Sequence, residues 1–330
     1  MRPLLALILL LSVSSAHAEL RTESLPAGAA GVVGMDLTAF RASKVGQAFE
    51  KFTSMKTKQL EASRKLSEQL GIDSMKDLHE IVIAVYPGDD GKVSEKDASG
   101  IVLIRGKFLP ARINAFGQAN ALPSKPAGKY QAWEAGAFIE KISGEKPKEN
   151  TKDAYVVAHS DNLVIIANAK LLERALASAD RREKSALLPS NVAAKFAAAR
   201  GGWFTLYVDA TKMKDAKQEV GAESLSLVLG ENAADLRLAA AAGFVSEDKA
   251  SLMRKQLAGL QAMATIGLMN ADEKSPEEKE NLTLLSELIQ KIRLGGEGKT
   301  ATLELDFPID KAVQAMTKAI EKSQVVPAGK

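Results

Sequence analysis

Apolar residues recur every three or four positions in several stretches of this chain, which is the spacing of an amphipathic helix. One such stretch predicts a long helix or two joined helices over residues 43–70, and the Gly71 that follows suits a helix C-terminus. A capping box at Ser275–Glu278 predicts the start of another helix, which we expect to end at Gly295–Gly296. Further helices are predicted to begin near Pro110, Asn168, Ser251 and Pro308.

Short runs of β-branched and aromatic residues, bounded by turn residues, predict strands between these helices. Ser160–Asn162 is the predicted turn of a hairpin, and Pro87–Ser99 is a longer polar hairpin loop. The run LRLAAAAGF at residues 236–244 fits a strand whose small side chains let a helix approach closely, and its alanines also fit a short helix. The other predicted strands cover residues 31–37, 80–88, 100–106, 154–159, 163–168, 202–209, 225–230 and 300–307.

The order of predicted elements occurs twice along the chain, which indicates an internal repeat. Gly31–Thr38 and Gly202–Thr211 each contain a strand that ends in Asp-x-Thr, and a strand, a loop, a strand and a helix follow in both cases. We therefore predict an α+β fold of two similar halves, each an antiparallel sheet built from hairpins with helices packed on one face. The predicted divisions are a signal peptide at 1–18, a first unit at 19–184, a second unit at 185–325 and a tail at 326–330.

The first residues have the pattern of a secretory signal peptide. A basic residue precedes the apolar run Leu4–Val13, and the small residues Ala16 and Ala18 predict cleavage between Ala18 and Glu19. The apolar run is too short to span a bilayer, so we expect no membrane anchor. These features predict an exported protein, either periplasmic or extracellular.

Composition excludes several classes of function. The chain of 330 residues contains no cysteine, which excludes disulfides, thiolate metal sites, cysteine nucleophiles and a lipidated cysteine. The net charge of +3 becomes +2 without Arg2, so the chain offers no strong field to nucleic acid. We therefore expect no nucleic-acid partner.

The motifs that suggest chemistry are incomplete in this chain. GGEGKT at Gly295–Thr300 resembles a phosphate-binding loop, but its first glycine is missing and the predicted order is helix, loop, strand. His79 and His159 are the histidines outside the signal peptide, and a metal site would have to depend on carboxylates. Ser143 and Ser246 each begin a Ser-x-x-Lys pattern without its accompanying elements. We expect no catalytic residue, no metal site and no cofactor.

A basic residue lies on each side of a glycine at Arg105–Gly106–Lys107, at the predicted end of a strand. We interpret Gly106 as the point where the chain turns out of the sheet, with both charges in water. Contact of an anion with Arg105 and Lys107 is the alternative interpretation of this segment.

Three segments of the first half carry a resemblance to a known type of protein. LPAGAAGVVGMDLTAF, LGIDSMKDLHEIVIAV and GIVLIRGKF, at residues 25–40, 70–85 and 100–108, resemble exported bacterial proteins of unknown function with a duplicated α+β unit. The resemblance covers most of the first half and extends more weakly into the second. It implies a fold and brings no catalytic residues.

These observations lead to one main hypothesis about function and two alternatives. The main hypothesis is a soluble, non-catalytic protein of the bacterial periplasm or cell envelope that binds an unknown envelope protein or small ligand. The first alternative is a carrier of lipid or another apolar molecule in a cleft between sheet and helices. The second alternative is a serine hydrolase. Candidates to line an apolar cleft are Met253, Met263, Met269 and Met316.

Overall fold

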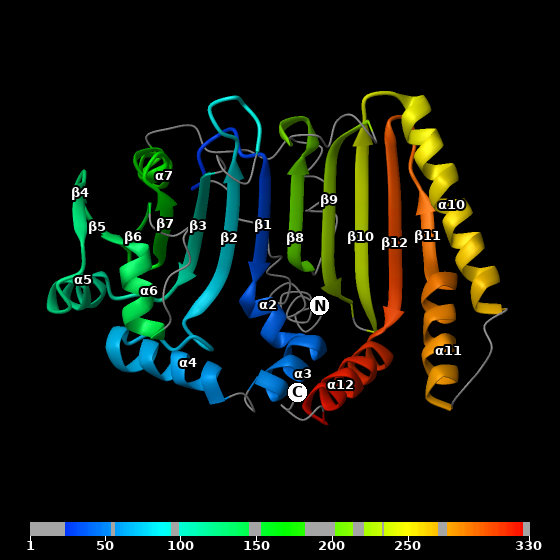
Figure 1. The fold of residues 1–330 in the computed structure, drawn as a ribbon, viewed down its shortest axis with the longest axis horizontal. Coiled ribbons are helices and arrows are strands. Elements are labelled where there is room, and N and C mark those ends of the chain that lie inside the picture. The colour runs from blue at the N-terminus through cyan, green and yellow to red at the C-terminus, as the bar shows by residue number, and fades with distance from the viewer. Residues whose placement is uncertain are drawn as a thin grey trace, which may run out of the picture.

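The strands of this protein form one antiparallel sheet, with helices at both of its ends (Figure 1). The computed structural model describes residues 24–53, 57–93, 99–144, 153–181, 202–213, 221–232, 234–269 and 276–325. The strands are β1 (Gly31–Asp36), β2 (Leu78–Tyr86), β3 (Ser99–Gly106), β4 (Ser124–Ala127), β5 (Tyr130–Glu134), β6 (Ala154–Ser160), β7 (Leu163–Asn168), β8 (Gly202–Asp209), β9 (Ala222–Glu231), β10 (Asp235–Phe244), β11 (Ile292–Gly295) and β12 (Thr300–Pro308). The helices are α2 (Leu37–Ala42), α3 (Lys44–Thr53), α4 (Thr57–Leu70), α5 (Pro110–Ala119), α6 (Ala135–Ser143), α7 (Leu172–Ala179), the short 3₁₀ turn η2 (Ala210–Lys212), α10 (Glu247–Met269), α11 (Pro276–Lys291) and α12 (Ile309–Val325).

The order of strands across the sheet is β11-β12-β10-β9-β8-β1-β2-β3-β7-β6-β5-β4. Strands from the first half of the chain lie on one side of the β1–β8 pair, and strands from the second half lie on the other side (Figure 1). Outward from this pair the order is β1-β2-β3-β7-β6 on one side and β8-β9-β10-β12-β11 on the other. A duplicated unit would produce this order. The division at residues 184 and 185 stays a prediction, because both residues lie outside the described part of the chain.

The two halves meet where β1 pairs with β8. Val33 lies opposite Leu206 at the middle of this antiparallel pair. At the end of each strand an aspartate caps the turn that follows: Asp36 Oδ1 accepts a hydrogen bond from the Ala39 amide at 2.7 Å, and Asp209 Oδ1 accepts one from the Thr211 amide at 3.1 Å. The two Asp-x-Thr segments therefore end their strands in the same way.

Alternate residues of each strand point to opposite sides of the sheet. We call the side that carries Val33, Ile83 and Leu227 face A, and the side that carries Val32 and Val82 face B. In the first half, face B is covered by α7, and its core includes Val32, Val82, Ile101, Leu103, Val157, Ile165, Leu172 and Leu176. Face A of the same half is covered by α4, α5 and α6, and its core includes Leu70, Phe108, Ile113, Phe116, Trp133, Phe138, Val156 and Val164.

The predicted α+β class, with antiparallel hairpins and helices packed on the sheet, is confirmed. The two halves share one continuous sheet, and in the first half α7 lies on the face opposite α4, α5 and α6. Helices therefore lie on both faces of the first half, on face A mainly over β3, β5, β6 and β7.

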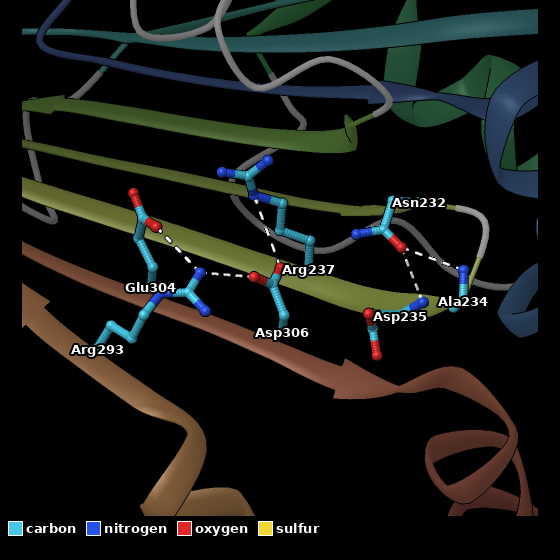
Figure 2. Close-up of polar contacts among 7 residues, drawn as sticks. All are labelled: Asn232, Ala234, Asp235, Arg237, Arg293, Glu304 and Asp306. Atoms are coloured by element: carbon cyan, nitrogen blue, oxygen red, sulfur yellow. Dashed lines mark hydrogen bonds and ion pairs between the residues drawn. The ribbon is translucent and has the colours of Figure 1, made fainter.

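The second half of the sheet is apolar on face A, and on face B its outer strands β10, β11 and β12 carry charged residues. Figure 2 shows the charged side: Arg293 of β11 lies between Glu304 and Asp306 of β12, with Nη2 at 3.2 Å from Glu304 Oε2 and at 2.5 Å from Asp306 Oδ2. Asp306 also lies beside Arg237 of β10, with 3.8 Å between Oδ1 and Nε (Figure 2). Face B thus carries paired charges on the outer strands of this half, whereas Tyr207 and Val228, nearer the centre of the sheet, are buried.

Some of the sequence predictions are confirmed by the structure, one helix end is wrong, and other predictions fall on residues outside the described part of the chain. The helical stretch at 43–70 is α3 followed by α4, with residues 54–56 outside the described part, and LRLAAAAGF is a strand, β10. The helix predicted to run to Gly295–Gly296 was wrong at its end, because residues 292–295 form β11. Ile292 and Leu294 lie opposite Leu305 and Leu303 of β12, and this pairing replaces the last helical turn. The signal peptide with its cleavage site at Ala18–Glu19, the cap residue Ser275 and the tail 326–330 lie outside the described residues.

Four elements of the first half were missed. One is the short helix α2 (Leu37–Ala42), which follows β1 directly. Residues 124–143 form β4, β5 and α6, for which no element had been predicted.

In the part of the chain that the structure describes, no helix is long and apolar enough to cross a membrane.

Candidate functional site

A cavity of about 520 Å³ lies between α10 and face A of the second half of the sheet. Its volume falls within the range typical of small-molecule sites, about 300–1,000 Å³. Strands β8, β9, β10 and β12 supply one wall, and Met253 and Leu257 of α10 supply the other. The lining residues are Val208, Ala210, Met213, Ala222, Ser224, Leu225, Ala240, Ala241, Ala242, Phe244, Met253, Leu257, Ala301, Thr302 and Leu303. None of these described lining residues carries a charge.

The cavity exists because small residues stand where the first half of the sheet has large ones. Ala242 of β10 lies opposite Ala301 of β12, and Ile104 of β3 lies opposite Val164 of β7. Ile104 and Val164 belong to the core beneath α4, α5 and α6. Replacing such a pair by two alanines removes the side-chain volume that would otherwise fill the space beneath the helix.

The strand register shows which residues of β3 and β10 occupy equivalent positions in the two halves. In β2 the pairing with β3 shifts between Leu78 and Glu80, and in β9 the pairing with β10 shifts between Ala222 and Ser224. Each shift leaves one extra residue in the strand, which is a β-bulge. Counted from the bulge, Ala242 occupies the position in β10 that Ile104 occupies in β3. The alanine run of β10 is therefore the feature that opens the pocket.

Two side chains fix α10 above the strands. Arg254 Nη1 donates to the carbonyl oxygens of Thr300 at 2.7 Å and Gly298 at 3.2 Å. Gln261 Nε2 donates to the carbonyl oxygens of Ile289 at 2.8 Å and Ile292 at 3.0 Å. Phe244, Ala250 and Ala301 form a small buried cluster next to Met253. Hydrogen bonds thus hold α10 in place where the apolar packing beneath it is incomplete.

The structure brings one of the four methionines named from the sequence to the pocket. Met253 lines it, whereas Met263 is 69% exposed on the outer side of α10. Leu252, Leu260 and Ile266 are also exposed on this helix. Met316 lies on α12, away from the lining, and the side chain of Met269 lies outside the described residues.

Arg105 and Lys107 are in different environments. The Arg105 guanidinium is largely buried, with Nε at 3.0 Å from Glu80 Oε2, and Nη2 donates to Ser24 Oγ at 3.1 Å. The expectation that the Arg105 charge lies in water was therefore wrong, because Glu80 on the neighbouring strand pairs with it. Lys107 is exposed, and contact of an anion with these two residues stays a prediction.

Gly106 is required by a close approach of the backbone. A Cβ atom at Gly106 would lie 2.1 Å from the Asp77 carbonyl oxygen. The Lys107 amide donates to the same oxygen at 2.8 Å. The geometry agrees with the interpretation of this glycine as the place where the chain leaves the sheet.

His159 forms a second polar cluster, with Asp180 and Tyr130. His159 Nε2 lies 3.0 Å from Asp180 Oδ1, and the Tyr130 hydroxyl donates to the same oxygen at 2.7 Å. Burial by itself would raise the pKa of Asp180, but the hydrogen bonds from Tyr130 and His159 and the charge of Lys129 outweigh it and lower this pKa to about 2. Asp180 is therefore an anion that holds the end of α7 to the sheet.

In the described part of the chain, this cluster lacks the third member of a hydrolase triad. In a triad one imidazole nitrogen contacts the carboxylate and the other contacts the serine hydroxyl. His159 Nδ1 is buried and has no hydrogen-bond partner among the described residues, and the neighbouring Ser160 donates to Asn162 instead.

The two Ser-x-x-Lys serines have other contacts. Ser246 Oγ accepts a hydrogen bond from the Lys249 amide, which caps the start of α10, and Ser143 donates to the Ile139 carbonyl oxygen. GGEGKT forms the turn between β11 and β12, with Gly296 and Gly298 at positive φ. Within the described residues, no group of His, Asp and Glu side chains could hold a metal ion.

The fold and the pocket define an α+β protein with a large antiparallel sheet and an apolar site on one face. Neither a protein-family model nor a curated protein matches the sequence. Solved structures of TP0453 have a distant likeness in fold. Crystal form III has a TM-score of 0.46 at 9% identity over 90% of this chain and 97% of that chain. Form I has 0.43 at 11% over 93% and 98%, and form IV has 0.45 at 9% over 93% and 98%.

Proposed function

We propose that this protein is an exported, non-catalytic binding protein of the bacterial periplasm or cell envelope that holds an apolar ligand in the pocket beneath α10. The observation that carries the proposal is the cavity of about 520 Å³ lined by alanine, leucine, methionine, valine and phenylalanine side chains. Each Å² of apolar ligand surface that such a lining removes from water makes the free energy of binding more favourable by about 25 cal/mol.

The composition of the lining favours a hydrocarbon over a polar metabolite. A polar ligand needs hydrogen-bond partners when it is buried, because an unpaired polar group loses its contacts with water. Ser224 and Thr302 are the lining residues with side-chain hydroxyls, and both come from strand positions that alternate with the apolar floor. Met253 and Met213 add flexible side chains that adapt to irregular apolar shapes.

Export is part of the proposal on sequence grounds. The leader at residues 1–18 supports it. The non-catalytic character is supported by the lining itself, which offers no histidine, carboxylate or lysine next to the two hydroxyls. Purified protein should give no turnover of ester, peptide or glycoside substrates. Turnover that depends on Ser143 or Ser246 would contradict this part of the proposal.

The binding proposal is tested by filling the pocket. We expect a neutral fluorescent naphthylamine probe to bind the wild-type protein and to bind Ala242→Leu at least about tenfold more weakly, because the new side chain occupies the space of the ligand. Ala239→Leu is the matched control, since Ala239 lies in the same strand on face B and outside the lining. Equal binding by all three proteins would show that the pocket is not the site.

A further inference from the structure

The apolar surface of face A continues beyond the pocket toward the first half of the sheet. Leu225 lines the pocket, and this residue is 41% exposed. Ile83 of β2, on the same face, is also 41% exposed. On face B the neighbouring Val82 is fully buried. Face A of the central strands is therefore the apolar side of the sheet that the described helices leave partly open.

The strand register connects these residues into one row. Leu227 of β9 lies opposite Leu206 of β8, Leu206 lies opposite Val33 of β1, and Val33 lies opposite Ile83 of β2. We call these four residues the central strip. Neighbouring strands are about 4.8 Å apart, so the strip extends about 14 Å from β9 to β2. It starts next to the pocket, because Leu227 of β9 lies opposite the lining residue Ala240 of β10.

The composition of β2 is unusual for a strand with one open face. Antiparallel strands with one side toward water usually alternate apolar and polar residues. In β2 the run Ile81–Val85 is apolar at every position, and Ile83 still lies partly in water. Exposed apolar surface of this kind marks binding sites more often than isolated exposed side chains do.

We propose that the ligand is a long unbranched hydrocarbon chain, with one end in the pocket and the rest along the central strip. This inference rests on the proposed function and adds the class of ligand to it. A compact ring system would fill the pocket and leave the strip in water. An extended chain would cover both, because the pocket and the strip form one continuous apolar path on face A.

The test uses fatty acids that differ only in chain length. We expect affinity measured by isothermal titration calorimetry to rise from octanoate through laurate to palmitate, since the longer chains reach the strip. Ile83→Asp should weaken palmitate binding at least about tenfold, the effect of losing about two buried methylene groups, and should leave octanoate binding unchanged. Ile83→Ser is the milder second variant and should show a smaller effect in the same direction.

Control variants separate failure of this inference from failure of the proposed function. Leu285→Asp places a charge on another exposed apolar residue, on α11, and should bind palmitate as the wild-type protein does. Ala242→Leu should weaken octanoate and palmitate alike. If octanoate and palmitate bind equally and the Ile83 variants bind both normally, the pocket holds the ligand and the strip inference is wrong. If no fatty acid binds the wild-type protein, the proposed function itself fails.

Discussion

At the scale of single residues, Glu231 joins the two halves of the chain. Its carboxylate, at the end of β9, accepts hydrogen bonds from the backbone amides of Lys44 and Val45, both at 2.8 Å. These amides are at the start of α3, where a helix has no partners of its own for them. A side chain of the second half therefore caps a helix of the first.

Removal of this cap should lower stability. We expect Glu231→Ala to reduce the free energy of unfolding by about 1 kcal/mol, the usual cost of losing a helix cap, measured by urea denaturation. Glu223→Ala, an exposed glutamate of the same strand, should change it much less. Equal effects of the two substitutions would contradict the capping role.

Asp180 should make stability depend on pH in the acid range. Its pKa in the folded protein is about 2, below the ordinary value of 3.8, so the ionised form stabilises the fold. That contribution is complete above about pH 4 and is lost as the pH falls toward 2. The urea midpoint of the wild-type protein should fall over this range, and the fall should be smaller in Asp180→Asn. Parallel curves for the two proteins would contradict this assignment.

At the scale of elements, β10 and α10 together determine the pocket. The alanines of β10 leave a space that α10 covers without filling, so the native protein contains unfilled apolar volume. Ala242→Leu should bury extra apolar surface in that volume and raise the free energy of unfolding of the ligand-free protein by about 1 kcal/mol. The variant should thus be more stable and yet lose binding. A clear loss of stability would show that the space is too small for the added side chain.

Local patterns in the sequence correctly predict most helices and hairpins, but they fail to predict the structure of two regions. The apolar spacing of α11 continues through Ile289 and Ile292, so residues 292–295 look helical until their pairing with β12 is known. β4 contains the proline of Ser124–Ala127 and shows no alternation, which hides it as a strand. In both cases a partner distant in sequence decides the structure.

The pocket was only partly predictable from the sequence. The alanine run and Met253 were visible as candidates, but the meeting of Ala242 with Ala301 depends on the register of β10 with β12. α10 has apolar residues on both sides, so the spacing of Met253 and Met263 could not show which of them faces the sheet. No comparable signal in the sequence pointed to the central strip.

At the scale of the whole molecule, several contacts bind the two halves together. β1 and β8 are paired, Lys44 Nζ lies 2.8 Å from Asp310 on α12, and Lys92 Nζ donates to the Thr211 carbonyl oxygen at 2.6 Å. The central pairing places backbone hydrogen bonds from both halves in one sheet. Neither half can lose β1 or β8 without exposing the strand edge of the other.

This arrangement predicts that the halves unfold together. Calorimetry should show a single transition in which the calorimetric and van't Hoff enthalpies agree. Leu206→Pro, which removes a backbone donor in β8 at the junction, should lower the temperature of that one transition. Two separate transitions in the wild-type protein would show that the halves are independent folding units.

The central claim is that the space beneath α10 holds an apolar molecule, and the most direct test is native mass spectrometry of protein purified from the cells that produce it. The account predicts a bound adduct that organic extraction removes and identifies as a long-chain hydrocarbon compound. It also predicts that Ala242→Leu, purified in the same way, carries little or none of it. A wild-type protein with the mass of the bare chain, or an adduct retained equally by Ala242→Leu, would contradict the claim.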